Sequence, residues 1–349
     1  MSEEIINPNA FVEGEMTQEQ TEVMEYLAEG ANTITRESKY EKWRGNIVQN
    51  RPYFTQGNPE LTGMTAYVIC AGPSLEKNID DLKTISDRGI IVCVDASLRS
   101  LLKRGIVPEY CVMIDGSEKM LTMMEGVDTS KTTLVCTPSA SPEAVAAWQG
   151  PRYFVTTPHH GVEKKYNSFH LTRVIKAKTD LKAGDELYLD EQYEVEFGGV
   201  TGNILCGGNV STAAHHFALV FLKVHQVAFV GLDLSWKYDN HHYADHEHQE
   251  NYRDRTKTFP MGHQDINGEE VFTNFSLMAF KRWHEQNAKI FKGTVINATE
   301  GGILGVGEKG VKLDYIEFST LKDTIAKYTP KKDLLAMPFS LNQPIEVNA

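Results

Sequence analysis

Short runs of apolar residues alternate along the chain with longer segments whose apolar residues recur at helical spacing. The clearest run is Ala66-Tyr-Val-Ile-Cys70, and its uninterrupted apolar character is typical of a strand buried on both faces. After Gly72 the period changes, and Leu75, Ile79 and Leu82 fall on one face of a helix. This stretch therefore predicts a strand, a tight turn and a helix, in that order.

The same alternation continues over most of the chain. Strands are predicted at 66–71, 90–94, 110–114, 132–136, 153–155, 226–231 and within 292–302. Helices are predicted at 75–87, 97–104, 117–125, 141–149, 209–218, 273–284 and 315–328. Short strands that alternate with helices predict an α/β fold with a doubly wound, mainly parallel sheet and helices on both faces.

Segments that do not follow this alternation of strands and helices suggest the domain organisation. Residues 1–58 are expected to form an N-terminal helical extension, with helices at 17–27 and 40–50. A single α/β domain is expected over 59–328, interrupted by a charged insertion at about 156–200 that we interpret as a lid. Residues 329–349 are expected to form an irregular tail.

Composition narrows the classes of function. The 349 residues carry a net charge of -12, which disfavours non-specific binding to nucleic acid or anionic membranes. The five cysteines include no Cys-x-x-Cys pair and are expected to be reduced thiols. The acidic N-terminus is not a secretory signal, and no apolar run approaches the roughly 20 residues that span a bilayer. We expect a cytoplasmic protein without a membrane span or a nucleic-acid partner.

The first candidate binding element is the turn Gly72-Pro-Ser74 between the first strand and its helix. Gly72 permits close approach of a ligand, Pro73 stiffens the turn, and Ser74 can cap the helix. Free backbone N–H groups at such a turn suit a phosphate, although the turn could also be a plain connection. Asp95 and Asp115 follow the next two strands, where they either line the same edge or cap helices.

A second candidate element lies before the strand at 226–231. Gly208 ends a Gly-Gly pair, and Asn209, Ser211 and Thr212 crowd the start of the next helix. Such a helix start could bind a phosphate, carboxylate or ribose, or it could simply be a well-capped helix. We expect the two turns to form one electropositive cradle for a phosphorylated ligand.

The densest titratable cluster is Tyr238-Asp-Asn-His-His-Tyr-Ala-Asp-His-Glu-His-Gln-Glu250. Its irregular spacing matches no zinc site, but histidine and aspartate here could act as a general base near neutral pH. His242 and Asp245 are the candidates from this segment. Glu300, which follows a predicted strand, is a third catalytic candidate, and it could instead pin a loop.

Six segments occur along the chain in a characteristic order. They are Val68-Ile-Cys-Ala-Gly-Pro-Ser-Leu75, Asp95-Ala-Ser-Leu98, Gly105-Ile-Val-Pro108 with Ile114-Asp115, Gly207-Gly-Asn-Val-Ser211, Gly231-Leu-Asp-Leu234 and Asn297-Ala-Thr-Glu-Gly-Gly302. Together they resemble the 6-hydroxymethylpterin diphosphokinase MptE-like domain, which is shared with the motility-associated (Maf) glycosyltransferases. The resemblance covers roughly residues 40–325 and implies a Rossmann-like core, distantly similar to the bacterial sialyltransferases.

The resemblance also implies site residues. Nucleotide contacts would come from Gly72, Pro73, Ser74, Gly208, Asn209, Ser211 and Thr212. Three aspartates, Asp95, Asp115 and Asp233, would line the pocket, where Mg²⁺ could bind. In the metal-dependent case Asp115 and Asp233 would be the metal ligands.

Two activities on this scaffold are implied by the family. Our leading hypothesis is a nucleotide-dependent glycosyltransferase that moves a nonulosonic, sialic-acid-like sugar from its CMP form to a protein or glycan acceptor. The alternative enzyme is a Mg²⁺- and ATP-dependent 6-hydroxymethylpterin diphosphokinase. A third hypothesis is a non-catalytic nucleotide-binding protein, since fold does not fix function.

Overall fold

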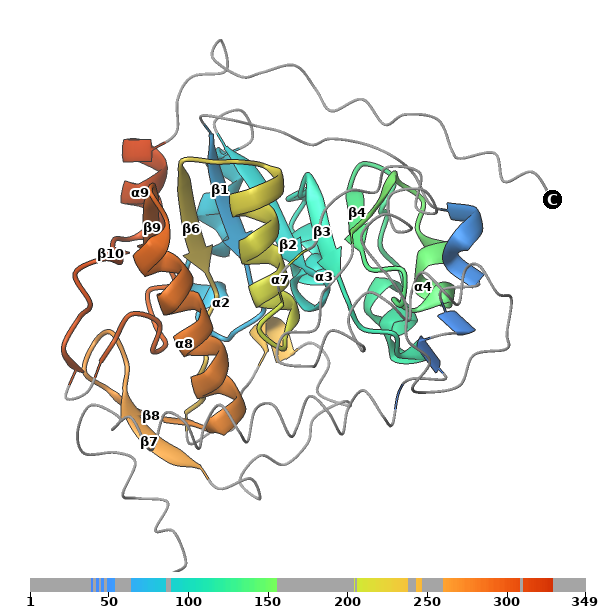
Figure 1. Cartoon of the computed structure of the whole chain (residues 1–349). Coiled ribbons are helices and arrows are strands. Elements are labelled where there is room, and N and C mark those ends of the chain that lie inside the picture. The colour runs from blue at the N-terminus through green and yellow to red at the C-terminus, as the bar shows by residue number, and fades with distance from the viewer. Residues whose placement is uncertain are drawn as a thin grey trace, which may run out of the picture.

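The computed structural model describes residues 39, 42–43, 45–46, 49–53, 64–85, 89–155, 204, 206–237, 243–246, 260–307 and 310–328. Within them, eight strands form one parallel sheet and two more form a hairpin (Figure 1). In sheet order the eight are β10 (Glu317–Phe318), β9 (Thr294–Asn297), β6 (Gln226–Val230), β1 (Thr65–Ile69), β2 (Ile90–Val94), β3 (Tyr110–Met113), β4 (Thr133–Cys136) and β5 (Arg152–Phe154). The predicted Rossmann-like, doubly wound α/β fold is confirmed.

The strand order reverses once. From β1 the chain moves outward one strand at a time to β5, and it then returns to place β6 on the other side of β1. From β6 it continues outward through β9 to β10. The carboxyl ends of β1 and β6 therefore flank a topological switch point, which is where open α/β sheets bind ligands.

Helices cover both faces of the sheet, because each strand sends alternate apolar side chains to opposite sides. Tyr67 and Ile69 of β1 join one core cluster, and Val68 and Cys70 join the other. The first face is covered by α2 (Leu75–Asn78), α3 (Asp95–Lys103), α4 (Pro142–Ala147) and α9 (Leu321–Tyr328). The second is covered by α7 (Val210–His216), which continues as a π-helix over Phe217–Phe221, and by α8 (Phe275–Ile290), both in front of the sheet in Figure 1.

Several predicted helices differ from the observed ones. The helix expected at 75–87 is α2 followed by a 3₁₀ segment, Ile79–Thr84. Helical geometry is interrupted at Asn78 (φ −135°), whose side-chain amide turns to bond the main-chain oxygen of Ala298. The helix expected at 117–125 is also 3₁₀, over Glu118–Met124.

The helix predicted at 315–328 is shorter in the structure. It begins at Leu321 rather than 315, because Glu317–Phe318 pairs with β9 as an edge strand. The helix predicted at 273–284 runs longer than expected, since α8 ends at Ile290.

The hairpin of β7 (Met261–Gln264) and β8 (Glu270–Thr273) was not predicted. Its turn contains Asn267-Gly268, a dipeptide that strongly favours hairpins, and Gly268 has φ +81°. The hairpin lies beyond the carboxyl edge of the sheet, at the bottom of Figure 1. It therefore lies on the side of the molecule where a ligand site is expected.

The expected insertion at 156–200, the tail at 329–349 and most of 1–58 lie outside the described residues, so the domain division stays a prediction. The described parts of 42–50 are helical, and the amides of Asn46 and Asn50 donate to main-chain oxygens after β3 and β4. Among the helices that the structure describes, none combines the length and apolar character needed to cross a bilayer.

Candidate active site

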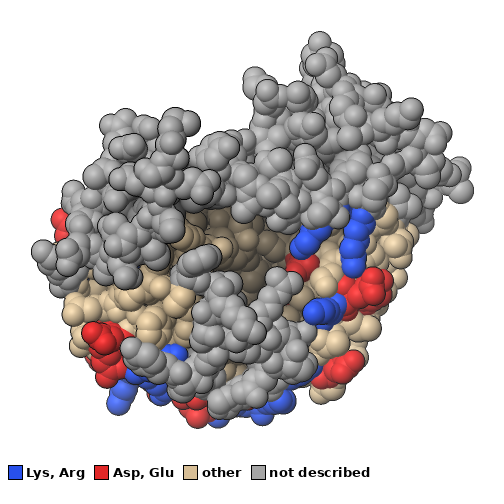
Figure 2. Space-filling view, turned by 90° about the horizontal axis from the view of Figure 1, so that it is seen from below, with Lys and Arg blue, Asp and Glu red and all other residues tan. Residues whose placement is uncertain are grey.

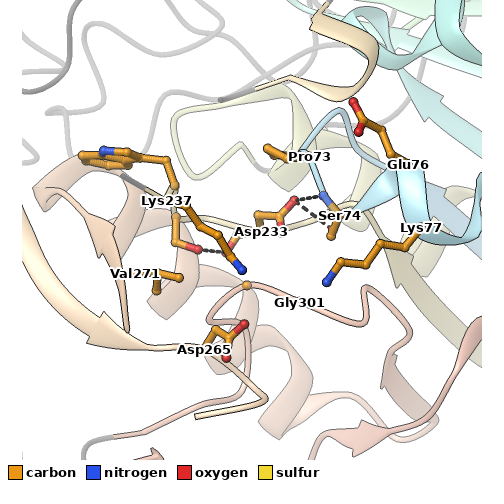
Figure 3. A pocket seen from close by; sticks show the side chains of 12 residues that line it. Pro73, Ser74, Glu76, Lys77, Asp233, Lys237, Asp265, Val271 and Gly301 are labelled. Carbon is orange, nitrogen blue, oxygen red and sulfur yellow. Dashed lines mark hydrogen bonds between the residues drawn. The ribbon is translucent and has the colours of Figure 1, made fainter. Parts of the chain in front are cut away.

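A pocket of about 320 Å³ opens at the carboxyl ends of β1, β6 and β9, at the switch point of the sheet (Figure 3). The turn after β1, the segment after β6, the hairpin and the loop after β9 all contribute to its wall. The lining residues are Pro73, Ser74, Glu76, Lys77, Asp233, Ser235, Trp236, Lys237, Asp265, Val271, Gly301 and Gly302.

The Gly72–Ser74 turn borders this pocket, but its backbone donors are not free as predicted. The N–H of Gly72 donates to the main-chain oxygen of Gly231 at 2.8 Å. The N–H of Ser74 donates to Oδ2 of Asp233 at 3.1 Å, and the Ser74 hydroxyl donates to the same atom at 2.9 Å. Ser74 makes no side-chain cap to α2, which corrects that prediction. A carboxylate of the protein itself thus occupies the expected anion position.

The close contact with Asp233 also explains why position 72 is a glycine. A methyl group there would lie 1.9 Å from Oδ2 of Asp233 and 2.6 Å from the main-chain oxygen of Gly231. Close approach is therefore required, as predicted, but the described group that approaches is Asp233 and not a ligand.

Asp233 is the acidic centre of the pocket. Burial raises the pKa of its carboxyl group to about 6, and the two hydrogen bonds from Ser74 oppose this shift. The charge of Lys77 also lowers the pKa of Asp233, whereas the neighbouring Asp265 raises it. Oδ2 carries both bonds from Ser74, while Oδ1 faces Gly301, where a methyl group would lie 3.3 Å away.

In the second turn, Gly207–Thr212, the polar side chains form hydrogen bonds within the turn itself. The Asn209 side chain caps α7 by accepting from the N–H of Thr212 at 3.0 Å, and it also accepts from the Ser211 hydroxyl at 2.9 Å. The Thr212 hydroxyl donates to the Asn209 main-chain oxygen and accepts from the N–H of Gly207. None of these residues lines the pocket. The described pocket is therefore formed without the second turn, and the predicted cradle of both turns stays a prediction.

The glycines of the second turn make room for aromatic rings of α8. A methyl group at Gly207 would lie 2.4 Å from Trp283, and one at Gly208 would lie 2.8 Å from Phe280. The predicted nucleotide contact at Gly208 therefore coincides with a helix-packing contact.

Behind this turn lies a buried polar network that was not predicted. The Ser211 hydroxyl lies 3.0 Å from Nε2 of His284, and Nδ1 of His284 lies 3.1 Å from Nδ1 of His215. Because Ser211 already donates to Asn209, Nε2 of His284 must donate to Ser211, and Nδ1 of His284 must accept from His215. Burial lowers the pKa of His284 to about 3 and that of His215 well below its usual value. Both rings are therefore neutral.

Asp95 and Asp115 follow β2 and β3 as predicted, and each carboxylate accepts a hydrogen bond from a nearby backbone N–H. Asp95 accepts from the N–H of Ala96 at 2.7 Å, and Asp115 accepts from the N–H of Ser117 at 2.8 Å. Burial raises the pKa of Asp95 to about 7, and the charge of Asp115 adds to the rise. Neither residue lines the described pocket.

The predicted metal ligands Asp115 and Asp233 do not fit a shared Mg²⁺ ion. Asp115 follows β3 and Asp233 follows β6, with β1 and β2 between them. Three strand spacings amount to roughly 14 Å, far beyond the reach of one ion. The described part of the chain also contains no group of three or more His, Cys, Asp or Glu residues arranged to hold a metal.

Asp245 lies in a short turn that packs between α2 and α3. Its carboxylate forms a two-point ion pair with Arg104, and these hydrogen bonds lower its pKa. The N–H of Ala244 donates to the main-chain oxygen of Ala71 at 2.9 Å, and the N–H of Asp245 donates to Oε1 of Glu76. These contacts make Asp245 an anchor beside the pocket and a weak base.

Glu300 also has a structural role. Its Oε1 accepts from the amide of Asn78 and from the N–H of Leu321, the first residue of α9, both at 3.0 Å. Its main-chain oxygen accepts from Nζ of Lys77 at 3.0 Å. The third catalytic candidate, His242, lies outside the described residues.

Two lysines of the pocket were missed by the sequence analysis. Lys77 and Lys237 direct their ammonium groups toward the pocket from opposite sides (Figure 3). Figure 2 views the molecule from the hairpin side, where the described surface is hollowed and carries cationic and anionic side chains close together. Their positions in the sequence could have indicated them. Lys77 lies three residues after Ser74, and Lys237 lies four residues after Asp233.

Comparison with known proteins agrees with this fold. A structure titled "Structure of MAf glycosyltransferase from Magnetospirillum magneticum AMB-1" matches with a TM-score of 0.52 and 14% identity. The match covers 82% of this chain but 40% of that one, and at this identity it shows the fold alone. None of the curated proteins matches the chain.

The family profile described as "6-hydroxymethylpterin diphosphokinase MptE-like" matches residues 41–239, more than half of the chain. This match supports a transferase in general, without fixing the group that is transferred. The chain belongs to the 6-hydroxymethylpterin diphosphokinase MptE-like family.

Proposed function

We propose that the protein is a transferase that binds a nucleotide-linked donor in the pocket between the ends of β1 and β6. The observation that carries this proposal is the position of the pocket at the topological switch point, with a hydroxyl, carboxylates and two ammonium groups in its wall. Family membership supports group transfer as the class of reaction.

The donor that we favour is a CMP-activated nonulosonic sugar, transferred to a hydroxyl of a protein or glycan. In this reaction the bond between the anomeric carbon and the phosphate oxygen breaks, and the acceptor oxygen forms the new bond. The acceptor proton must pass to a base. Asp245 and Glu300 are held in structural contacts, which leaves His242 as the predicted base.

The alternative is a Mg²⁺- and ATP-dependent 6-hydroxymethylpterin diphosphokinase. The description of the matched family favours it. The separation of Asp115 from Asp233 weighs against it in the predicted form, because these two carboxylates cannot bind one ion between them. We therefore rank it second.

Thermal unfolding in the presence of CMP, CTP, ATP or GTP, each with and without Mg²⁺, separates these functions. A ligand that binds the native state raises the melting temperature. The glycosyltransferase predicts a rise with CMP that does not require Mg²⁺. The diphosphokinase predicts a rise with ATP that does require it.

Transfer itself is tested with a CMP-activated nonulosonic sugar by measuring CMP release. Release above the spontaneous rate supports the proposal. Binding of CMP with no release in the presence of protein or glycan acceptors would favour the non-catalytic hypothesis. A melting temperature unchanged by every nucleotide would contradict the proposed function.

A further inference from the structure

The sequence predicted that backbone donors of the Gly72–Ser74 turn hold the phosphate, but the protein has already committed them. Asp233 accepts two hydrogen bonds through one oxygen, from the N–H and the hydroxyl of Ser74. Ser74 is 4% exposed. A ligand phosphate would have to displace a buried carboxylate before it could bind these donors, and the phosphate must therefore find other partners.

Lys77 and Lys237 are suited to that role. The ammonium group of Lys77 donates to a neutral acceptor, the main-chain oxygen of Glu300, and this contact does not neutralise its charge. A methyl group at Gly301 would lie 3.6 Å from Nζ of Lys77, so glycine there keeps the space beside the ammonium group open. Lys237 approaches from the opposite wall (Figure 3). It pairs with the exposed Glu269 at 2.5 Å.

We propose that Lys77 and Lys237 form the anion-binding clamp of this pocket, and that they select a ligand with one phosphate over a triphosphate. The inference rests on the proposed function. Asp233 acts in this arrangement as a resident anion that shapes the turn. Lys77 makes the stronger contact because, among the described residues, no carboxylate forms a direct ion pair with its ammonium group, whereas Lys237 must share its charge with Glu269.

The charge of the lining supports selection for a low ligand charge. Two lysines stand against three carboxylates, which are Glu76, Asp233 and Asp265. The clamp is therefore a local positive site within a wall of net negative charge. One phosphate group placed between the lysines gains their attraction, whereas the further phosphates of a triphosphate would approach the carboxylates.

The experiment measures dissociation constants of CMP and CTP by calorimetry for the full chain and for Lys77→Met, Lys237→Met and Lys83→Met. Lys83 is a matched control, because it is an exposed lysine paired with Asp80 at 2.7 Å and does not line the pocket. We expect Lys77→Met to weaken CMP binding roughly tenfold or more, as for the loss of a charge-assisted hydrogen bond. Lys237→Met should weaken it less, Lys83→Met should leave it unchanged, and the unmodified chain should bind CMP more tightly than CTP.

Three results would overturn the clamp while leaving the proposed function intact. These are CMP binding by Lys77→Met at the affinity of the unmodified chain, equal weakening in Lys83→Met, and tighter binding of CTP than of CMP. Failure of the unmodified chain to bind any nucleotide would instead contradict the proposed function. The two failures are therefore distinguishable in one series of titrations.

Discussion

The two glycine-containing turns of this protein have similar sequences and different surroundings. Gly72–Ser74 and Gly207–Thr212 each combine small residues and hydroxyl side chains at a helix start. The first borders a pocket and binds Asp233, a residue that follows another strand. The second caps α7 through Asn209 and packs against aromatic rings of α8. Their neighbours distinguish them, because the first turn borders the pocket at the switch point and the second packs against α8.

In both turns, hydrogen bonds within the protein already engage backbone N–H groups that could otherwise bind a ligand. Buried backbone N–H groups almost always have partners within the folded chain. In the first turn the partners are Asp233 and the main-chain oxygen of Gly231. In the second turn Asn209 and Thr212 supply them. A glycine-rich helix start therefore predicts that a hydrogen-bond acceptor lies close to its backbone N–H groups. That acceptor can belong to the protein and need not belong to a ligand.

The largest expected effect comes from filling the space at the first turn. Gly72→Ala places a methyl group 1.9 Å from Asp233 and 2.6 Å from backbone oxygen, which cannot rotate away. We expect the free energy of unfolding, measured by urea denaturation, to fall by about 3 kcal/mol, at the upper end of overpacking costs. Gly262→Ala is the control, since a methyl group there meets nothing within 4 Å. Equal stability of the two variants would show that Asp233 is not fixed against this turn.

The pH dependence of stability should separate the two regions by sign. The pKa of Asp233 is raised from 3.8 to about 6, so its contribution to stability is present below pH 3.8 and lost as pH rises through 6. The pKa of His284 is lowered from 6.5 to about 3, so its contribution is present above pH 6.5 and lost as pH falls toward 3. Acidification therefore favours the first region and penalises the second.

Two variants measure these opposing contributions. Between about pH 4 and 6, Asp233→Asn should lose stability on acidification more steeply than the unmodified chain, by up to about 1.4 kcal/mol per pH unit. His284→Gln should lose it less steeply by a similar amount. The measurement is urea denaturation at a series of pH values, and slopes are compared because each variant also changes absolute stability. Changes of the same sign would contradict the assignment.

Removal of one polar side chain from each turn tests which of them belongs to the site. Ser74→Ala removes a hydrogen bond to a carboxylate and should cost about 2 kcal/mol of stability. Asn209→Ala removes a helix cap and should cost about 1 kcal/mol. The thermal shift caused by CMP should shrink in Ser74→Ala alone, because Ser74 lines the pocket and its hydroxyl holds Asp233 in the pocket wall, whereas Asn209 does not line the pocket. An equal loss of the CMP response in Asn209→Ala would place the second turn in the site after all.

The sequence predicted the strands well because a strand buried on both faces has a local signature. Ile90–Val94 was predicted with its observed bounds, and the other strands that were given bounds differ by at most two residues at either end, whereas β7, β8 and β10 were missed. The polar site was less predictable, because its contacts join distant residues. Ser74 and Asp233 are 159 positions apart, and nothing in either neighbourhood identifies the other as a partner. Lys77 and Lys237 resemble ordinary solvated lysines in the sequence, and only the fold brings them to one pocket.

Asp245 illustrates the same limit within the cluster at 238–250. The sequence predicts titratable chemistry there, since histidine and aspartate are dense. It does not reveal that Arg104, at the end of α3, pairs with Asp245 and lowers its pKa. In the pocket, burial raises the pKa of Asp233 to about 6. The sequence presents Asp233 only as one of several aspartates at strand ends.

The smallest expected effect concerns the contact between that segment and the first turn. Arg104 and Asp245 are 27% and 23% exposed, so solvent screens their ion pair, and we expect a coupling free energy of about 0.5–1 kcal/mol. A double-mutant cycle with Arg104→Gln and Asp245→Asn, followed by urea denaturation, measures it.

Because Ala244 and Asp245 donate to Ala71 and Glu76, loosening the pair should also weaken CMP binding slightly through the first turn. The same variants should leave the stability contribution of His284 unchanged, since no hydrogen bond or ion pair between described residues joins the second turn to this pair. A CMP affinity unaffected by either substitution would show that the first turn keeps its shape without the anchor, and that Asp233 alone fixes it.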